Sequence, residues 1–264
     1  MSDYTIERGL GVRQRMDLLA AVRGPATAQL LDSLSLGAGA RCVDVGCGGG
    51  HVAIEIARRV GPGGSVLGID LDEALLDVAR STATELGLVN ITFRVADAED
   101  LRETGLDLVF SRLMLMHLRD PEHIVSLMAT AIRSGGVVAL EDANFAGCFA
   151  YPCCASFDRW VEWYQETVRR NGGDPELGLR LPMLLRSAGL SLVGVRVVQD
   201  AFVDGPFKQL QQMSMSKQRA AVLAAGVASA DEYDAAHAEM RAFADDPTTM
   251  MAGPRVIQAW GQLP

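Results

Sequence analysis

A glycine-rich segment that follows a short run of β-branched residues is the strongest chemical signal in this sequence. Residues 43–50 read VDVGCGGG, which indicates a strand, a turn and the beginning of a helix. Glycine suits such a turn because a ligand that lies against bare backbone leaves no room for a Cβ atom, and because the turn can require a positive φ. Ligands of α/β sheets bind outside the carboxyl ends of the strands, so this turn predicts a nucleotide-like ligand.

The spacing of the glycines separates two kinds of ligand. A dinucleotide-binding turn reads GxGxxG or GxGxxA; counted from Gly46, that register fails because the third glycine comes one residue early, at Gly50. Counted from Gly48, the pattern ends at Ala53 but leaves Asp44 without a role. A carboxylate at the strand end would repel a pyrophosphate and attract a ligand that carries an ammonium and a sulfonium. We therefore favour S-adenosylmethionine, and a nicotinamide-dependent oxidoreductase stays as an alternative.

Three further motifs complete a pattern of four. Asp70 ends the predicted second strand, Asp97-Ala98 follows the third, and Ser111-Arg112 follows the fourth. With these motifs in order, about residues 41–142 resemble the class I S-adenosylmethionine-dependent methyltransferases. Within that class the chain is similar to bacterial small-molecule enzymes of the ubiquinone and menaquinone type and to natural-product tailoring enzymes.

The resemblance implies a role for each motif. Asp70 would accept hydrogen bonds from both ribose hydroxyls, Leu71 would pack on the adenine, and Asp97 would bind the adenine amino group. The backbone at Ser111-Arg112 would hold the methionine ammonium. The implied cofactor-binding residues are Asp44, Gly46, Cys47, Gly48, Gly50, Asp70, Leu71, Asp97, Ala98, Ser111 and Arg112.

Alternating β-rich runs and helical periodicity provide the elements that would position these motifs, and such alternation is typical of a parallel sheet with crossover helices. Strands are predicted at about 43–45, 65–69, 91–95, 106–110 and 137–140, and helices at about 51–60, 72–87 and from 120. Residues 191–198 also read as a strand, and the resemblance implies that the last strand is antiparallel and lies beside the fifth. We expect a Rossmann-like doubly wound α/β sheet of seven strands, mostly parallel.

The remaining segments are predicted to form a lid on a single methyltransferase domain. The core would comprise about residues 25–142, 178–200 and 249–264, and the helical lid about residues 1–24, 145–175 and 204–245. Residues 145–175 are rich in aromatic side chains and read as a helical insertion. No repeat or low-complexity linker marks off a second domain.

Residues after the fourth and fifth strands are candidates for the acceptor site. His117 is a candidate general base because the ordinary pKa of histidine is about 6.5; a helix cap is the alternative. Glu141 is a candidate substrate contact or lid anchor. Phe145, Tyr151 and Trp160 are candidate substrate contacts, although aromatic side chains at helical spacing often form a buried helix face.

The five cysteines, Cys42, Cys47, Cys148, Cys153 and Cys154, lack the repeated CxxC spacing of a structural zinc site, so we predict no metal. The last three leave open an arsenite-type enzyme with thiolate ligands, but plain packing of the side chains is the simpler explanation.

The charge of the chain restricts its partners. The formal net charge is -9 and the sequence holds two lysines, which argues against nucleic acid as a partner. Residues 1–17 lack an apolar signal core and no window suits a membrane span, so we expect a cytoplasmic protein. The sequence leaves a homodimer open.

Taken together, the sequence predicts methyl transfer from S-adenosylmethionine to an O, N or C atom of a small-molecule metabolite. Two alternatives remain open: an enzyme that uses the cofactor to promote cyclisation or rearrangement without methylation, and a non-catalytic regulatory protein that binds the cofactor.

Overall fold

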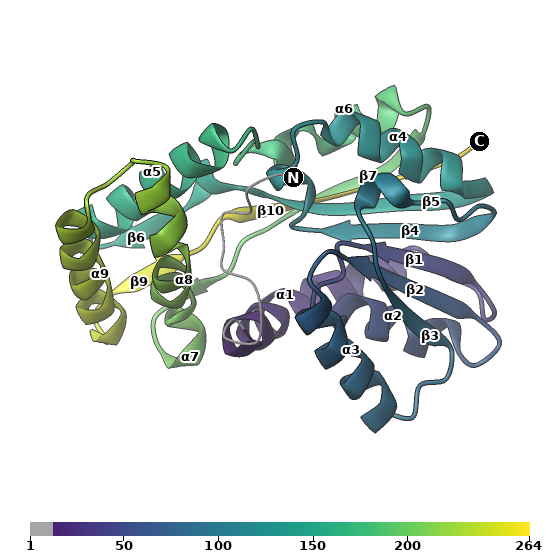
Figure 1. Ribbon diagram of the computed structural model, residues 1–264, viewed down its shortest axis with the longest axis horizontal. Coiled ribbons are helices and arrows are strands. Elements are labelled where there is room, and N and C mark those ends of the chain that lie inside the picture. Colours follow the sequence, from purple (N-terminus) through teal and green to yellow (C-terminus); the bar gives the residue numbers. More distant parts are fainter. Residues whose placement is uncertain (1–12) are drawn as a thin grey trace.

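A doubly wound sheet forms the centre of the protein, whose computed structural model describes residues 13–264 (Figure 1). Within these residues the sheet has seven strands in the order β3-β2-β1-β4-β5-β10-β7. Their bounds are β1 Arg41–Val45, β2 Ser65–Asp70, β3 Ile91–Val95, β4 Leu106–Arg112, β5 Ile132–Asn144, β7 Ser191–Val198 and β10 Arg255–Gln262. Strand β10 runs antiparallel to both β5 and β7, and the other neighbouring pairs are parallel. The predicted fold class is confirmed.

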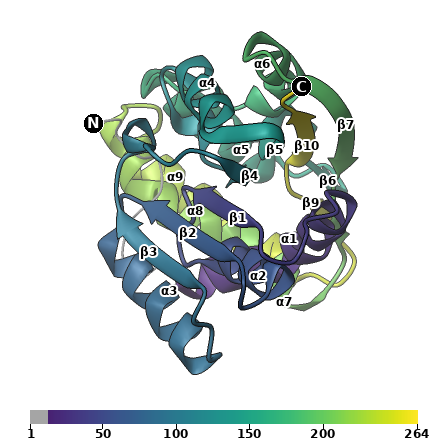
Figure 2. The same ribbon diagram turned by 90° about the vertical axis from the view of Figure 1, so that its right-hand side faces the viewer.

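Helices cover both faces of the sheet (Figure 2). On one face lie α1 (Arg13–Ser33), α2 (His51–Val60) and α3 (Glu73–Glu85), and on the other α4 (Pro121–Ala131) and α6 (Leu181–Ser187). Two of the helices begin at predicted caps: Asp72 accepts a hydrogen bond from the Leu75 NH, and Asp120 accepts one from the His123 NH. Each face therefore has its own apolar core, and the strands between them are buried on both sides.

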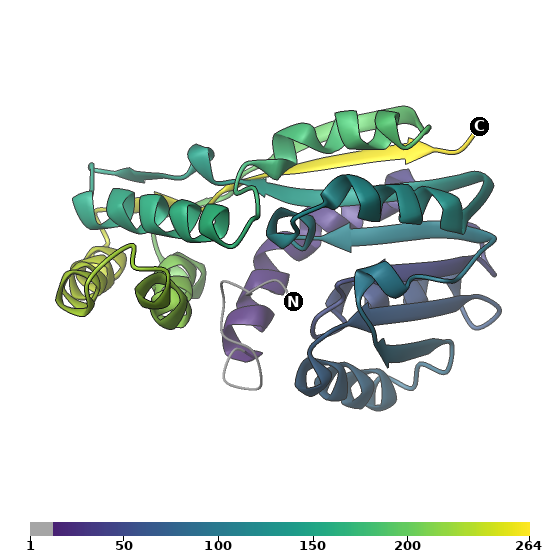
Figure 3. The ribbon, with the colours of Figure 1, turned by 45° about the horizontal axis from the view of Figure 1, so that its top comes forward.

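A second group of helices packs beyond the carboxyl ends of the parallel strands (Figure 3). Helices α5 (Ala155–Arg170), α8 (Leu210–Ala224) and α9 (Ala230–Asp245) share a third apolar core, which includes Trp160, Met215 and Tyr233. The short helix α7 (Gly205–Lys208) precedes α8. A reciprocal cap between Ser229 and Glu232 begins α9. The predicted helical stretch 204–245 thus consists of three helices, α7, α8 and α9.

The lid segments are not wholly helical, which corrects the prediction. Strands β6 (Phe149–Tyr151), β8 (Ala201–Phe202) and β9 (Met250–Ala252) form a small sheet in the order β6-β9-β8 within the described part of the chain. These strands are only two or three residues long, and their pairing joins segments far apart in sequence. Local periodicity could not reveal them. The predicted lid contribution of residues 1–12 lies outside the described residues.

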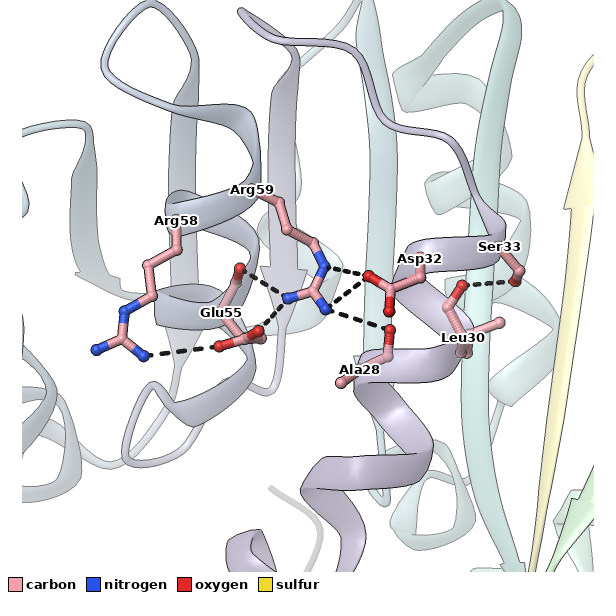
Figure 4. A network of polar contacts seen from close by, with 7 residues as sticks. All are labelled: Ala28, Leu30, Asp32, Ser33, Glu55, Arg58 and Arg59. Atoms are coloured by element: carbon pink, nitrogen blue, oxygen red, sulfur yellow. Dashed lines mark hydrogen bonds and ion pairs between the residues drawn. The ribbon is translucent and has the colours of Figure 1, made fainter.

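Helix α1 is fixed to α2 by a guanidinium network (Figure 4). Arg59 donates to Asp32 Oδ1 from Nε at 3.1 Å and from Nη2 at 2.9 Å, and Nη2 also donates to the Ala28 carbonyl at 3.3 Å. The same side chain contacts Glu55, which also pairs with Arg58 at 3.7 Å. The network holds the C-terminal half of α1 against the sheet layer and so orients its N-terminal half toward the pocket described below.

No helix in residues 13–264 is both long and apolar enough to cross a bilayer.

Candidate active site

The glycine turn after β1 is built on left-handed backbone. Gly46, Gly48 and Gly50 have φ values of 73°, 51° and 76°, a region that side chains other than glycine rarely adopt. The NH groups of Gly46 and Cys47 both donate to the Ile69 carbonyl, at 2.8 and 3.0 Å. Because of these bonds, the turn lies directly against the end of β2.

Two of these glycines are required by protein packing. A Cβ atom at Gly46 would lie 2.6 Å from Met114 Cγ, and one at Gly50 would lie 2.7 Å from the Ala79 Cβ atom. Gly50 is buried under α3 and does not line the pocket, so the prediction that it contacts the cofactor is not supported. Space for a ligand therefore explains glycine only at positions of the turn that line the pocket. At position 50, packing against α3 explains it.

The acids after β2 and β3 lie at the same edge of the sheet. Asp70 accepts from the Gly48 NH through Oδ2 at 2.8 Å and from the Asp72 NH through Oδ1 at 2.9 Å. Asp97 begins a one-turn helix, η2 (Ala98–Asp100), by accepting from the Glu99 NH at 3.1 Å. Both carboxylates are held by backbone NH groups while they line the pocket. Such bonds place an acceptor without consuming all its lone pairs.

Asp44 is the buried acid of the site. Its Oδ2 has no hydrogen-bond partner in the described residues although the side chain is 2% exposed. Burial raises the pKa of Asp44 to about 7, and the nearby Arg112 opposes that rise. A buried acceptor without a partner is costly to the fold, so this oxygen is suited to a cationic or hydrogen-bonding ligand.

One pocket collects most of the predicted cofactor residues. Asp44, Gly46, Cys47, Gly48, Asp70, Leu71, Asp97, Ala98 and Arg112 all line it. Leu71 is 47% exposed at the mouth, as an apolar platform for a ring would be. Ser111, by contrast, is buried within β4 and does not line the pocket. Its predicted backbone contact to the cofactor is therefore not supported, whereas the next residue, Arg112, is in place.

The same pocket continues toward α5 and α8. His117, Phe145 and Trp160, which the sequence offered as candidate acceptor-site residues, line this second half. Sequence reasoning missed the contributions of α1 and α8, which are Arg15, Leu19, Arg23, Leu210, Gln211, Ser214 and Gln218. Arg15, Leu19 and Arg23 are spaced by four residues, which places them on one face of α1. This periodicity was the signal in the sequence that could have predicted their shared position.

His117 lies on the one-turn helix η3 (Leu115–His117), which follows β4. Burial, with a smaller contribution from the charge of Arg15, lowers the pKa of His117 to about 4. The imidazole is therefore neutral at neutral pH, and with this pKa it is a weak base. Asp142, at the end of β5, accepts from the Met116 NH at 3.0 Å and from the Ala143 NH at 2.8 Å. This carboxyl group holds the turn that carries His117.

Two predicted substrate contacts lie elsewhere. Glu141 is buried, and its oxygens accept from Thr27 Oγ1 at 2.9 Å and from Gln258 Nε2 at 2.7 Å. It joins α1 to the sheet and does not line the pocket, so its alternative role as an anchor is the one supported. Tyr151 lies on β6, is 68% exposed and is also outside the pocket. The short second sheet carries it outward, which the sequence did not predict.

The cysteine positions do not form a metal site. In the described part of the chain, no three His, Cys, Asp or Glu side chains are grouped so as to hold a metal ion. Cys148 is partly buried with its thiol pKa raised to about 12 by burial, while Cys153 is exposed. The thiolate set of an arsenite-type enzyme is therefore not supported by the geometry.

The fold and the pocket together define a protein that binds a nucleoside cofactor at the carboxyl edge of a doubly wound sheet. Residues 36–172 match the model of a family described as a methyltransferase domain. A ubiquinone biosynthesis O-methyltransferase of Cupriavidus pinatubonensis is 40% identical over 189 residues, which cover 70% of this chain and 72% of that protein. The chain belongs to the class I S-adenosylmethionine-dependent methyltransferase family.

Other similarities cover less or show only the fold. A ubiquinone biosynthesis O-methyltransferase of Acinetobacter baylyi is 39% identical over 110 residues, covering 40% of this chain and 45% of that protein. The match thus spans less than half the length of this relative. The crystal structure of a Bacillus halodurans protein assigned to the methyltransferases superposes with a TM-score of 0.61 at 21% identity, covering 90% of this chain and 98% of that one. At that identity the likeness shows the fold alone.

Proposed function

We propose that this chain transfers a methyl group from S-adenosylmethionine to an oxygen, nitrogen or carbon atom of a small-molecule metabolite. The observation that carries the proposal is the continuity of the pocket. Its one half is lined by the acids and glycines of the cofactor motifs, and its other half by His117, Phe145 and Trp160. A donor and an acceptor bound in the two halves would therefore be adjacent.

The residues of the first half fit the cofactor by their chemistry. Asp70 and Asp97 are acceptors fixed by backbone NH groups, which suits the ribose hydroxyls and the adenine amino group. Asp44, with its unpartnered Oδ2, suits a positively charged group. When bound, the cofactor supplies a methyl group already activated by the sulfonium.

The protein's part in the reaction is alignment and the exclusion of water. Helices α1, α5 and α8 each contribute pocket residues, so they enclose the reacting atoms. Orientation alone can contribute about 7–11 kcal/mol to such a step. For an acceptor that must lose a proton, the neutral imidazole of His117 is the candidate base, and its pKa of about 4 makes it a weak one.

The named relatives support oxygen as the first acceptor atom to test, since both are ubiquinone biosynthesis O-methyltransferases. The partial coverage of these relatives leaves the acceptor molecule itself to experiment. We further propose that the protein is cytoplasmic, forms a homodimer and has the core and lid bounds predicted from the sequence. We also propose that it does not bind nucleic acid, which the formal charge of -9 supports.

The decisive experiment incubates the purified protein with a metabolite library and cofactor labelled in the methyl group. We expect labelled product and S-adenosylhomocysteine in equal amounts for at least one compound, and loss of both in Asp70→Ala. Conversion of a compound without S-adenosylhomocysteine would instead favour the cyclisation or rearrangement alternative. Tight cofactor binding without conversion of any compound would favour the regulatory alternative.

A further inference from the structure

Helix α8 turns a row of polar side chains toward the acceptor half of the pocket. Gln211, Ser214 and Gln218 are spaced by three and four residues, which places them on one face of the helix. All three line the pocket, and they are only 4%, 6% and 1% exposed. Buried polar groups are normally hydrogen-bonded, so each member of the row should have a partner.

Two members of the row are held by neighbouring elements. Ser214 Oγ donates to the Leu210 carbonyl at 2.7 Å and accepts from Arg15 Nε at 2.9 Å. Gln218 Oε1 accepts from Trp160 Nε1 at 2.7 Å, which fixes the carboxamide between α8 and α5. This bond occupies Oε1, so the donor nitrogen Nε2 is the part of the Gln218 carboxamide that a ligand would meet.

Gln211 is the unsatisfied member of the row. Its Oε1 is buried and has no hydrogen-bond partner in the part of the chain that the structure describes. Its Nε2 lies against Gly253, where an added Cβ atom would come within 2.8 Å. Glycine at 253 thus makes room for this carboxamide. The last torsion of glutamine is soft, so rotation can turn either the oxygen or the nitrogen toward a ligand.

Aromatic side chains form another part of the wall of this half. Phe145 and Tyr164 pack with ring centroids 4.4 Å apart and both line the pocket beside Trp160. His117 on the same side is uncharged at neutral pH because burial lowers its pKa to about 4. The wall favours a ring or another flat apolar body, and the α8 row favours polar groups along one edge of it.

We propose that the acceptor is a ring-containing molecule whose hydroxyl or carbonyl group is recognised by the carboxamides of Gln211 and Gln218. This inference rests on the proposed function, because it assigns the acceptor class of the same pocket. A carboxamide offers both a donor and an acceptor without charge. A site built to hydrogen-bond a ligand rejects an analogue that leaves its buried polar groups unpaired.

The test uses two naphthalene probes that differ in one polar group: 2-hydroxymethylnaphthalene and 2-ethylnaphthalene. Each is titrated calorimetrically into the protein saturated with S-adenosylhomocysteine. We expect the alcohol to bind at least tenfold more tightly than the hydrocarbon. Equal or stronger binding of the hydrocarbon, or no binding of the alcohol, overturns the inference.

Variants then test the residues. Gln211→Leu should weaken binding of the alcohol by about tenfold or more, because it removes the buried carboxamide. Gln212→Leu, on the same helix but outside the pocket, is the matched control and should not change it. Equal binding by wild type and Gln211→Leu contradicts the proposal. Failure of the wild-type protein to bind S-adenosylhomocysteine would instead contradict the proposed function.

Discussion

The backbone NH of Gly48 donates a hydrogen bond of 2.8 Å to Asp70 Oδ2 and so joins the glycine turn to the acid that ends β2. This bond between two parts of the protein sets the positions of the two motifs relative to each other. A carboxylate held in this way loses little freedom on binding, which makes the cofactor half of the pocket preorganised.

Removal of this carboxylate should weaken cofactor binding. Asp70→Ala is expected to reduce the affinity for S-adenosylmethionine by on the order of 1.5–3 kcal/mol, because charged hydrogen bonds to the ligand are lost. Isothermal calorimetry measures the effect, and Asp77→Ala on exposed α3 surface is a control. Unchanged affinity in Asp70→Ala would mean that the site is misplaced.

Cofactor affinity should rise with pH near neutrality. The pKa of Asp44 is raised to about 7 by burial, with Asp70 and Glu141 adding to the rise and Arg112 opposing it. Only the ionised form attracts a cationic ligand, so affinity should increase from pH 6 to 8 and binding should release a proton. Calorimetry in buffers of different ionisation enthalpy detects that proton. Asp44→Asn should abolish the release, and a release that persists in this variant would argue against Asp44 as its source.

The same carboxyl group should make the ligand-free protein less stable as pH rises. A folded pKa above the ordinary value of 3.8 means that the native state holds a proton that the unfolded state loses first. The contribution is fully present below about pH 4 and is lost as pH rises through about 7. Denaturant unfolding of wild type and Asp44→Asn at pH 5 and 8 should show a smaller loss in the variant. An equal loss in both would locate the effect in another group, with Asp142 the first to examine.

His117 should affect turnover more than cofactor binding. For an acceptor that loses a proton, His117→Phe is expected to lower kcat by about 10²-fold, the low end of the range for general bases because the pKa of about 4 makes this base weak, while cofactor affinity stays within twofold. Because the pKa of His117 is lowered to about 4, the wild-type rate should show no inflection from this residue between pH 6 and 8. A wild-type kcat in His117→Phe, accompanied by a lower melting temperature, would assign the residue a structural role instead.

Two glycine substitutions should change stability in opposite directions. Gly24 lies inside α1 with open space where a Cβ atom would be, so Gly24→Ala should stabilise by about 0.5–1 kcal/mol. At Gly194 on β7, a Cβ atom would overlap the Trp260 ring, and Gly194→Ala should destabilise by about 1–3 kcal/mol. Urea unfolding of both variants provides the comparison. The same sign of change in both would refute this account of the two positions.

The sequence by itself determined the sheet and the cofactor motifs of this protein. Strand and helix periodicity, the caps at Asp72 and Asp120, and the glycine turn are local signals whose physical causes act within a few residues. The carboxyl ends of parallel strands share one edge, so Asp44, Asp70 and Asp97 were brought together by topology alone.

Only the tertiary structure decided which side chains complete the pocket. Glu141 binds Thr27 and Gln258, which lie more than a hundred positions away in the sequence. Tyr151 points outward because it lies on a short strand that has no local signature in the sequence. Likewise, Gln211 of α8 lines the pocket and lies against Gly253, which is distant in the sequence. Long-range packing sets these positions, and a pattern read along the chain carries no information about which distant surface a helix face will meet.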